Sequence, residues 1–170
     1  MNIAVIGFRG TGKTTICRLL AKNLDKKLVS TDEEIARKTK MPIANFVKKS
    51  GWEKFRDVES EIIESVSELD ECVFDTGGGI VVRNENVINL KKNALVILLT
   101  ADAKTIAERI RGNKDRPALT KSNYLDEIEE VLKEREDKYR KAADYAIDTS
   151  MLSPEEVCGL ITVYIQMELN

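Results

Sequence analysis

Five short apolar segments recur along the chain, and stretches with the spacing of amphipathic helices separate them. Strands that alternate with helices indicate an α/β fold with a parallel sheet. The segment 94–99 is continuously apolar, which is typical of a parallel strand covered by helices on both faces. We therefore expect helices on both sides of the sheet. The predicted strands are 2–7, 27–30, 72–75, 94–100 and 145–148.

Local signals delimit three helices and one loop. Helical spacing runs over 52–69 and over 124–143. The last helix begins with a capping box in which Ser153 is the N-cap and Glu156 completes the pair. Residues 112–123 lack periodicity and are rich in breakers and charge, so we expect a mobile loop that could act as a lid.

The composition fits one compact domain, 1–170, whose 42% hydrophobic residues suffice for a core. A formal net charge of -2 gives no reason to expect a nucleic-acid partner. The chain opens directly into an apolar strand and has no run of ~20 apolar residues, so we expect a cytoplasmic protein without a membrane partner. Cys17, Cys72 and Cys158 lack the spacing of zinc or redox motifs and are expected to be small buried residues.

The strongest motif follows the first predicted strand and precedes a helix. Residues 7–14 read Gly-Phe-Arg-Gly-Thr-Gly-Lys-Thr and match the phosphate-binding pattern G-x-x-x-x-G-K-[ST]. The glycines let backbone N–H groups turn toward phosphates, Lys13 reaches the outer phosphates, and the Thr14 hydroxyl can ligate Mg²⁺. An incidental glycine-rich turn would not combine the glycines, the lysine and both flanking elements. The residues assigned to ATP here are Gly10, Thr11, Gly12, Lys13, Thr14 and Thr15.

A phosphate-binding loop alone does not distinguish a kinase from a GTPase or an ATP-driven binding protein. The guanine-reading segment Asn-Lys-x-Asp of GTPases does not occur in this sequence. The chain length fits the small-molecule kinases better. A kinase needs an acceptor site, and the remaining motifs bear on it.

Candidate acceptor residues follow the second and third strands, at the edge where open α/β sheets bind ligands. The chain has no histidine, so a carboxylate such as Asp32 could deprotonate a substrate hydroxyl. Asp32 could also be the N-cap or a first-turn acid of the next helix. Gly77, Gly78 and Gly79 let the backbone approach a ligand closely, or they form a tight structural turn.

Two arginines are candidates for binding an anion. Arg56 and Glu59 are i,i+3 neighbours that can pair, although such a pair alone is typical of a helix surface. Arg135 falls on an otherwise apolar helix face, where a guanidinium binds a carboxylate or phosphate, or snorkels to the edge of the core. The stripe that contains it is Leu125, Ile128, Leu132, Arg135 and Tyr139.

Six motifs follow one another along the chain: the loop 7–14, Ser30-Thr31-Asp32, Phe55-Arg56-x-x-Glu59, Gly77-Gly78-Gly79, Arg116-Pro117-Ala118-Leu119 and Glu134-Arg135-x-x-x-Tyr139. In this order they resemble the shikimate kinase family over essentially the whole chain. The resemblance implies a P-loop fold of the nucleoside monophosphate kinase type, with three layers, a five-stranded parallel sheet, a substrate-binding helical region at about 32–62 and a lid at about 112–123. It implies MgATP-dependent phosphorylation of the 3-hydroxyl of shikimate in aromatic amino acid biosynthesis, by a monomer.

The resemblance also implies roles for single residues. Asp32 would bind the shikimate hydroxyls and act as the base. Arg116 would close from the lid over the ATP phosphates and act in catalysis with Lys13, and Arg109 would flank the adenine. The implied acceptor residues are Asp32, Arg56, Glu59 as the residue that orients Arg56, Gly77, Gly78, Gly79 and Arg135.

One position departs from the family pattern. The family shows an Asp-x-Asp pair whose first carboxylate supports the Mg²⁺ shell, and this chain has Ser30 at that place. The third strand ends in Asp75 after an apolar run, which is the form of a Walker B element. Our hypothesis is that Asp75 takes over, directly or through water, the role that Ser30 cannot fill. The alternative is that Asp75 caps the glycine turn.

Two classes of alternative function remain open from the sequence. A P-loop kinase for another small carboxylate or polyol, such as gluconate, or for a nucleoside monophosphate, would share the loop and differ in the acceptor pocket. A non-catalytic ATP-binding regulatory module is favoured by Ser30 alone. The joint presence of the predicted catalytic and acceptor residues argues against such a module.

Overall fold

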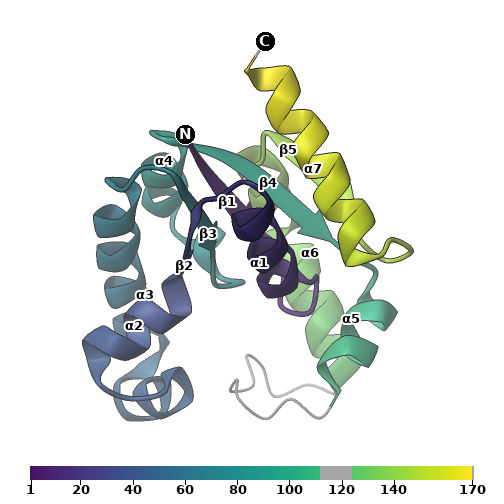
Figure 1. Cartoon of the computed structure of the whole chain (residues 1–170). Coiled ribbons are helices and arrows are strands. Elements are labelled where there is room, and N and C mark those ends of the chain that lie inside the picture. Colours follow the sequence, from purple (N-terminus) through teal and green to yellow (C-terminus); the bar gives the residue numbers. More distant parts are fainter. Residues whose placement is uncertain (112–123, 170) are drawn as a thin grey trace.

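A sheet of five parallel strands lies between layers of helices (Figure 1). The computed structural model describes residues 1–111 and 124–169. The strand order is β2-β3-β1-β4-β5, which places the first strand at the centre. The predicted three-layer α/β fold is confirmed. The strands are β1 (Asn2–Ile6), β2 (Lys27–Ser30), β3 (Cys72–Asp75), β4 (Ala94–Thr100) and β5 (Tyr145–Asp148).

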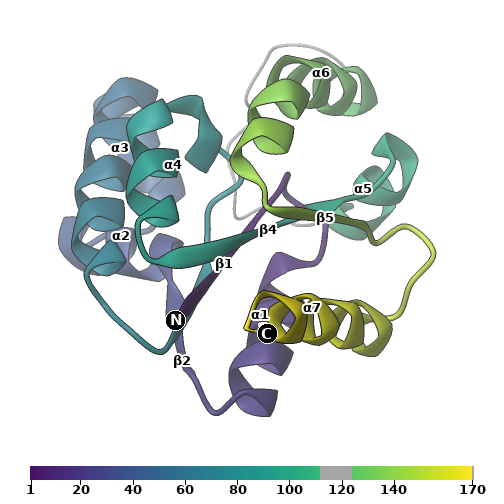
Figure 2. The ribbon, with the colours of Figure 1, turned by 90° about the horizontal axis from the view of Figure 1, so that it is seen from above.

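Helices connect the strands and cover both faces of the sheet. In Figure 2, α1 and α7 lie on one face, and α3, α4 and α6 lie on the other. The helices are α1 (Lys13–Asn23), α2 (Thr31–Thr39), α3 (Ile43–Ser67), α4 (Asn84–Lys91), α5 (Ala103–Ile110), α6 (Tyr124–Ala142) and α7 (Pro154–Glu168), with a 3-10 turn at Ile80–Val82.

Successive residues of β1 point to opposite faces, as the pleat of a strand requires. Ile3 and Val5 pack into the cluster under α1 and α7, whereas Ala4 and Ile6 pack into the cluster under α3, α4 and α6. All four side chains are almost completely buried. The continuous hydrophobicity of the strand therefore comes from two separate cores, one on each face.

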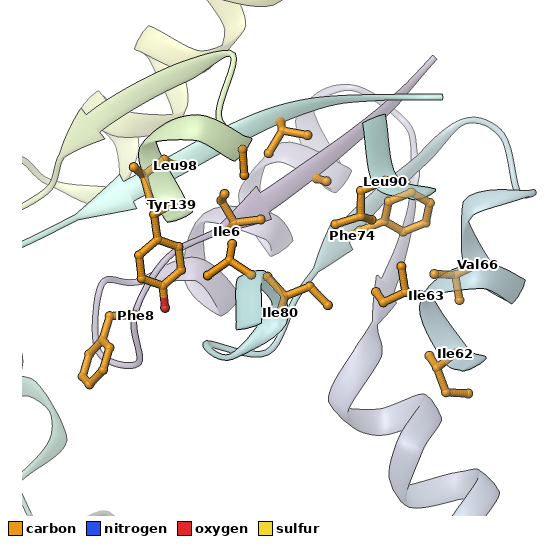
Figure 3. Close-up of a cluster of buried hydrophobic side chains, with 14 of the residues drawn as sticks. Ile6, Phe8, Ile62, Ile63, Val66, Phe74, Ile80, Leu90, Leu98 and Tyr139 are labelled. Carbon is orange, nitrogen blue, oxygen red and sulfur yellow. The ribbon is translucent and has the colours of Figure 1, made fainter. Parts of the chain in front are cut away.

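The larger core supports the loops that follow the strands. Figure 3 shows Ile6 of β1 and Leu98 of β4 in this core, with Tyr139 from α6 and Phe8 from the loop after β1. Phe8 and Tyr139 are buried. The loop after β1 and the C-terminal half of α6 are thus anchored in the same cluster.

Most predicted element limits agree with the structure, and α3 extends further than the helix predicted for it. Four strands have the predicted limits, and β1 ends one residue earlier, at Ile6. The helix predicted at 52–69 corresponds to the part of α3 that follows a kink and ends at Ser67, and a further helical segment, 43–50, precedes the kink. Gly51 kinks α3 with φ 82° and ψ 166°, a conformation that a residue with a side chain rarely adopts. The kink lies directly before the predicted helix, so the segment before it is the part that the prediction missed.

Smaller predictions had mixed outcomes. The capping box of Ser153 and Glu156 at the start of α7 is present. The three cysteines are buried and carry free thiols. Leu125 contradicts the predicted apolar stripe, because it is 40% exposed at the first turn of α6. The predicted lid, 112–123, which includes Arg116, lies outside the described residues.

Over residues 1–111 and 124–169, the structure contains no helix that is both long enough and apolar enough to cross a membrane.

The chain builds the sheet outward from β1 in both directions, because β1 pairs with β3 on one side and with β4 on the other. Such a change of direction opens a crevice at the carboxyl ends of the strands, where α/β proteins bind ligands. The loops after β1, β2 and β3 meet there.

Candidate active site

The phosphate-binding loop begins at Gly7, where the neighbouring strand β4 leaves no space for a side chain. Gly7 has a φ of 142°, and a Cβ at this position would overlap the carbonyl oxygen of Leu99 on β4. The loop ends at Gly12, from which α1 starts. The first N–H groups of a helix have no partner within it, so the start of α1 offers donors and a positive dipole end to an anion.

Lys13 lies inside this loop. The residue is buried, and its Nζ donates a hydrogen bond of 3.0 Å to the Phe8 carbonyl. The hydroxyl of Thr11 donates to the same carbonyl at 2.8 Å. The loop backbone thus holds the ammonium group in place. Lys13 also lines the cavity that Thr14 and Thr15 line.

Arg109 connects α5 to the loop through a residue that the sequence motifs do not include. Its Nη1 donates to the hydroxyl of Thr149 at 2.9 Å and to the Gly10 carbonyl at 3.3 Å. Thr149 follows β5, is buried, and donates from its hydroxyl to the Thr11 carbonyl at 3.0 Å. The predicted adenine-flanking arginine therefore lies at the rim of the nucleotide cavity, anchored to the loop.

The loop, Arg109 and the ends of β2 and β3 enclose a cavity of about 580 Å³. This volume is within the range of small-ligand pockets, which is ~300 to 1,000 Å³. All six residues assigned to ATP from the motif lie in or beside it, and we call it the nucleotide pocket. Its lining residues include Gly10, Gly12, Lys13, Thr14, Thr15, Ser30, Asp32, Asp75 and Arg109.

A second pocket adjoins the first and contains a buried ion pair. Nη1 of Arg56 lies 2.6 Å from Oε2 of Glu59, and the two side chains are 10% and 1% exposed. The predicted pairing is confirmed, and its burial rules out a surface pair. The Arg56 guanidinium lies 5.5 Å from the ring centroid of Trp52 and 5.1 Å from that of Phe55, within cation–π range.

Burial raises the pKa of Glu59, and the neighbouring charge of Asp32 raises it further, whereas Arg56 opposes the shift. The carboxyl atom Oε1 of Glu59 is buried and has no hydrogen-bond partner among the described residues. Glu59 thus depends on Arg56 for the pairing of its other oxygen. Loss of the arginine would leave a buried carboxylate, which is a costly arrangement.

The glycine turn after β3 leaves space for the side chains of this second pocket. A Cβ at Gly79 would overlap the guanidinium of Arg56, and one at Gly77 would lie 2.8 Å from Oδ1 of Asp32. The turn is therefore both a tight turn and one wall of the pocket. Larger residues at these two positions would displace the charged groups that the pocket contains.

Arg135 reaches the same turn from α6. Its Nη1 donates a 3.2 Å hydrogen bond to the Gly78 carbonyl, and the Tyr139 hydroxyl donates to the same oxygen. Burial raises the pKa of Tyr139. The Nε of Arg135 is buried and has no partner among the described residues. The guanidinium therefore has donor capacity left for an anion in the pocket.

Asp32 lies in the first turn of α2, whose N-cap is Ser30. The Ser30 hydroxyl accepts from the Glu33 amide at 3.3 Å, so the alternative that Asp32 is the N-cap is wrong. Asp32 is a first-turn acid, and it also lines both pockets. We call the second pocket the acceptor pocket, and its lining residues include Asp32, Arg56, Glu59, Gly77, Gly78, Gly79 and Arg135.

The model of the shikimate kinase family matches residues 9–166. The chain is 42% identical to shikimate kinase of Thermodesulfovibrio yellowstonii, over 94% of this chain and 92% of that one. The chain belongs to the shikimate kinase family. Another member, from Caldicellulosiruptor bescii, is 40% identical over 98% of this chain and 97% of its own.

A solved member of the shikimate kinase family, from Acinetobacter baumannii in complex with shikimate, has the same fold. It superposes with a TM-score of 0.94 at 30% identity and covers 98% of this chain and 93% of its own. The structure of Aquifex aeolicus shikimate kinase matches with a TM-score of 0.86, also at 30% identity. The fold of this family member is therefore that of the solved shikimate kinases.

Within this family member, the structure gathers the predicted site residues into two adjoining pockets, apart from Thr11, which belongs to the loop but lines neither pocket, and Arg116, which lies outside the described residues. Sequence reasoning missed three residues: Thr149, Arg9 and Glu127. Arg9 lines both pockets, and Glu127 lines the nucleotide pocket. Arg9 stands at a variable position of the loop pattern, and Glu127 is one of many acids on α6, so neither carries a motif.

Proposed function

We propose that this chain transfers the γ-phosphoryl group of ATP to the 3-hydroxyl of shikimate, giving 3-phosphoshikimate and ADP. The observation that carries the proposal is the pair of adjoining pockets, one formed by the phosphate-binding loop and the other lined by three arginines and two carboxylates. Membership of the family supports shikimate over gluconate as the acceptor.

The acceptor carboxylate would be bound by Arg56 and Arg135. A guanidinium binds a carboxylate with two parallel hydrogen bonds, and Arg135 has a buried Nε without a partner among the described residues. Glu59 fixes the orientation of Arg56 through their ion pair. The two arginines extend from α3 and α6, so the acceptor would lie between these helices.

Phosphoryl transfer needs positioning and neutralisation of charge more than covalent assistance. Asp32 would accept the proton of the acceptor hydroxyl as its oxygen attacks the γ-phosphorus. Lys13 and the N–H groups of the loop would neutralise the outer phosphates. Arg116, which lies outside the described residues, is proposed as a further cation on the phosphates.

Oxygen donors at the nucleotide pocket fit Mg²⁺, which prefers hydroxyl, carboxylate and water ligands. Thr14 lines this pocket, and the last residues of two neighbouring strands, Ser30 and Asp75, are partners in the β2–β3 register and line it too. Thr14 would bind Mg²⁺ directly and Asp75 through water. Mg²⁺, when bound, neutralises charge on the ATP phosphates.

The contacts of the glycine turn favour this role for Asp75 over capping. The Thr76 amide donates to the Val5 carbonyl, and the Gly77 amide donates to the Thr31 hydroxyl. These two amides therefore do not need the Asp75 carboxylate as a cap. In this proposal, the carboxylate at the end of β3 serves in place of the one that the family pattern has at the adjacent end of β2.

Replacing Asp75 by asparagine is expected to raise the Mg²⁺ concentration for half-maximal activity by roughly 10- to 100-fold, the scale for loss of an outer-shell metal partner. Electron paramagnetic resonance of Mn²⁺ with ADP would show the same weakening without turnover. Asp137→Asn on the exposed face of α6 is the matched control. An unchanged Mg²⁺ titration in Asp75→Asn would contradict the assignment.

The function is tested by a coupled ADP-release assay with MgATP and a panel of shikimate, gluconate and nucleoside monophosphates. We expect turnover that requires shikimate. Release of ADP with another acceptor alone would keep the kinase fold and reject the substrate. ATP binding without turnover on any acceptor would support a regulatory module instead.

Other features of the protein remain predictions based on the resemblance. ATP, Mg²⁺ and shikimate are the partners that we propose. A monomer located in the cytoplasm stays our expectation, and sedimentation velocity would test the oligomeric state.

A further inference from the structure

An ion pair links the phosphate-binding loop to α6. Nη2 of Arg9 lies 3.0 Å from Oε1 of Glu127, and the two side chains are 13% and 4% exposed. The loop pattern accepts any residue at the position of Arg9, so the backbone cradle does not require an arginine there. Desolvation opposes the burial of two charges. We therefore expect Arg9 to have a role at the site other than forming the phosphate-binding loop.

Arg9 stands where the two pockets meet. Among the described residues, Arg9 and Asp32 are the two that line both the nucleotide pocket and the acceptor pocket. A phosphoryl group that leaves ATP has to pass between these pockets to reach the acceptor hydroxyl. Asp32 places a carboxylate on that path, and Arg9 places a cation on it.

Several contacts fix the Arg9 side chain. Its Cζ lies 5.7 Å from the ring centroid of Phe8, which is itself buried in the core, and Glu127 pairs with its Nη2. The glycine turn packs against its backbone, because a Cβ at Gly78 would lie 3.1 Å from the Arg9 nitrogen. The cation is therefore positioned before any ligand binds.

The guanidinium also keeps unused donor capacity. Its Nε is buried and has no hydrogen-bond partner among the described residues. A guanidinium has five N–H donors, and pairing with one carboxylate oxygen leaves others for an anion. A buried donor without an acceptor is destabilising, so an anionic ligand at this point would remove an unfavourable feature of the free protein.

We propose that Arg9 contacts the phosphoryl group during its transfer and that Glu127 is a positioning residue that holds Arg9. The proposal rests on the proposed function. In the transfer, the acceptor oxygen forms a bond to the γ-phosphorus, and the bond from that phosphorus to the bridging oxygen breaks. The electron pair of the broken bond leaves with ADP, and the hydroxyl proton passes to Asp32.

The expected benefit falls on the transition state. Charge spreads over the equatorial oxygens of the γ-phosphoryl group as it moves between the pockets, and a preorganised cation stabilises that charge. Interactions that strengthen in the transition state raise kcat without tightening the binding of either substrate. Arg9 should therefore affect kcat more than the affinity for ADP or shikimate.

The same helix holds both the partner of Arg9 and an acceptor arginine. Glu127 lies in the first turn of α6, and Arg135 lies eight residues later on the same helix. At ~1.5 Å per residue the two positions are roughly 12 Å apart along the axis. A single rigid element thus sets the position of the acceptor relative to the transferring group.

The test begins with Arg9→Met, which removes the charge and keeps much of the apolar length. We expect kcat to fall by roughly 10²- to 10³-fold, the scale for removing one preorganised donor to a developing charge. Calorimetric affinities for ADP and for shikimate should change little. Binding of MgADP with aluminium fluoride and shikimate, a transition-state mimic, should weaken along with kcat.

Glu127→Gln tests the positioning role. This variant should show a smaller loss of kcat than Arg9→Met. The double variant Arg9→Met/Glu127→Gln should be no slower than Arg9→Met, because Glu127 acts through Arg9 and the effects of such a pair do not add. Additive losses would overturn the positioning role. Arg9→Lys keeps a charge, should recover part of kcat, and serves if Arg9→Met does not fold.

The matched control is the exposed pair of Arg140 and Glu136 on α6, whose side chains are 63% and 60% exposed. Arg140→Met and Glu136→Gln should leave kcat unchanged.

An Arg9→Met enzyme that keeps its kcat would overturn the proposal, whether or not its affinity for ADP or shikimate falls. If another acceptor supports turnover where shikimate does not, the proposed function fails, and the same variants are assayed with that acceptor.

Discussion

Arg56→Ala is expected to weaken shikimate binding by about 2 to 5 kcal/mol, the scale for truncating one partner of a buried charge pair. This corresponds to a loss of affinity of roughly 30- to 4,000-fold. Arg56 pairs with Glu59 at 2.6 Å in the acceptor pocket and does not line the nucleotide pocket. Affinity for ADP should therefore be preserved, as isothermal titration calorimetry of each ligand would show.

The variant leaves Glu59 buried without its arginine, so folding has to be checked by thermal unfolding. Arg56→Lys is the second variant, because it retains a positive charge beside Glu59 but lacks the planar fork that binds a carboxylate with two hydrogen bonds. Arg37→Ala is the control, since Arg37 pairs with Glu34 at the same i,i+3 spacing on the solvent side of α2. Equal losses of ADP and shikimate affinity in a folded Arg56→Ala protein would contradict the assignment.

Asp32→Asn is expected to lower kcat by about 10²- to 10⁴-fold, the usual contribution of a general base. Asparagine keeps the shape of the side chain but cannot accept the hydroxyl proton. The KM for ATP should change little, because the loop and Lys13 still bind the phosphates. Steady-state kinetics with both substrates varied would separate the two parameters.

Glu34→Gln is the matched control for this carboxylate. Glu34 lies two residues further along α2 and forms a surface pair with Arg37, so its loss should leave kcat unchanged. A near-normal kcat in Asp32→Asn would show that proton transfer to this residue does not limit the reaction. In that case Asp32 would be a residue that binds the acceptor hydroxyls without acting as a base.

Local sequence signals predicted the sheet well. The four strands with confirmed limits are short apolar runs that end at a charged or polar residue, such as Asp75 or Asp148. Periodicity also identified Arg135, because a guanidinium on an apolar stripe needs an anion or a path to solvent. These features depend on neighbours within a few positions along the chain, which a sequence shows directly.

Long-range contacts were not predictable in the same way. Arg9 and Glu127 are 118 positions apart, and Arg109 meets Thr149 across 40 positions. The residues carry no pattern that distinguishes them from other polar side chains. Their partnerships follow from the strand order, which brings the loop after β1 close to α6 and to the end of β5. The helical segment 43–50 was missed for a different reason, because Gly51 separates it from the spacing that predicted the helix at 52–69.

The burial of the Arg56–Glu59 pair also came from the structure alone. The spacing predicted the pair, but an i,i+3 pair occurs on most helix surfaces and its exposure is not a local property. Trp52 and Phe55 on the same helix, and Gly79 on the turn after β3, enclose it. The space at Gly79 leaves room for the Arg56 guanidinium beside the turn, and the pair thus lines the pocket that we propose for the acceptor.

The central claim is that the γ-phosphoryl group goes to shikimate, and product identification in a mixture tests it most directly. The wild-type protein is incubated with MgATP and equal concentrations of shikimate, gluconate and AMP, and the products are followed by phosphorus NMR with proton correlation. We predict one new phosphate monoester, coupled to the proton at carbon 3 of shikimate. A phosphate ester on gluconate, transfer to AMP, or inorganic phosphate alone would contradict the account.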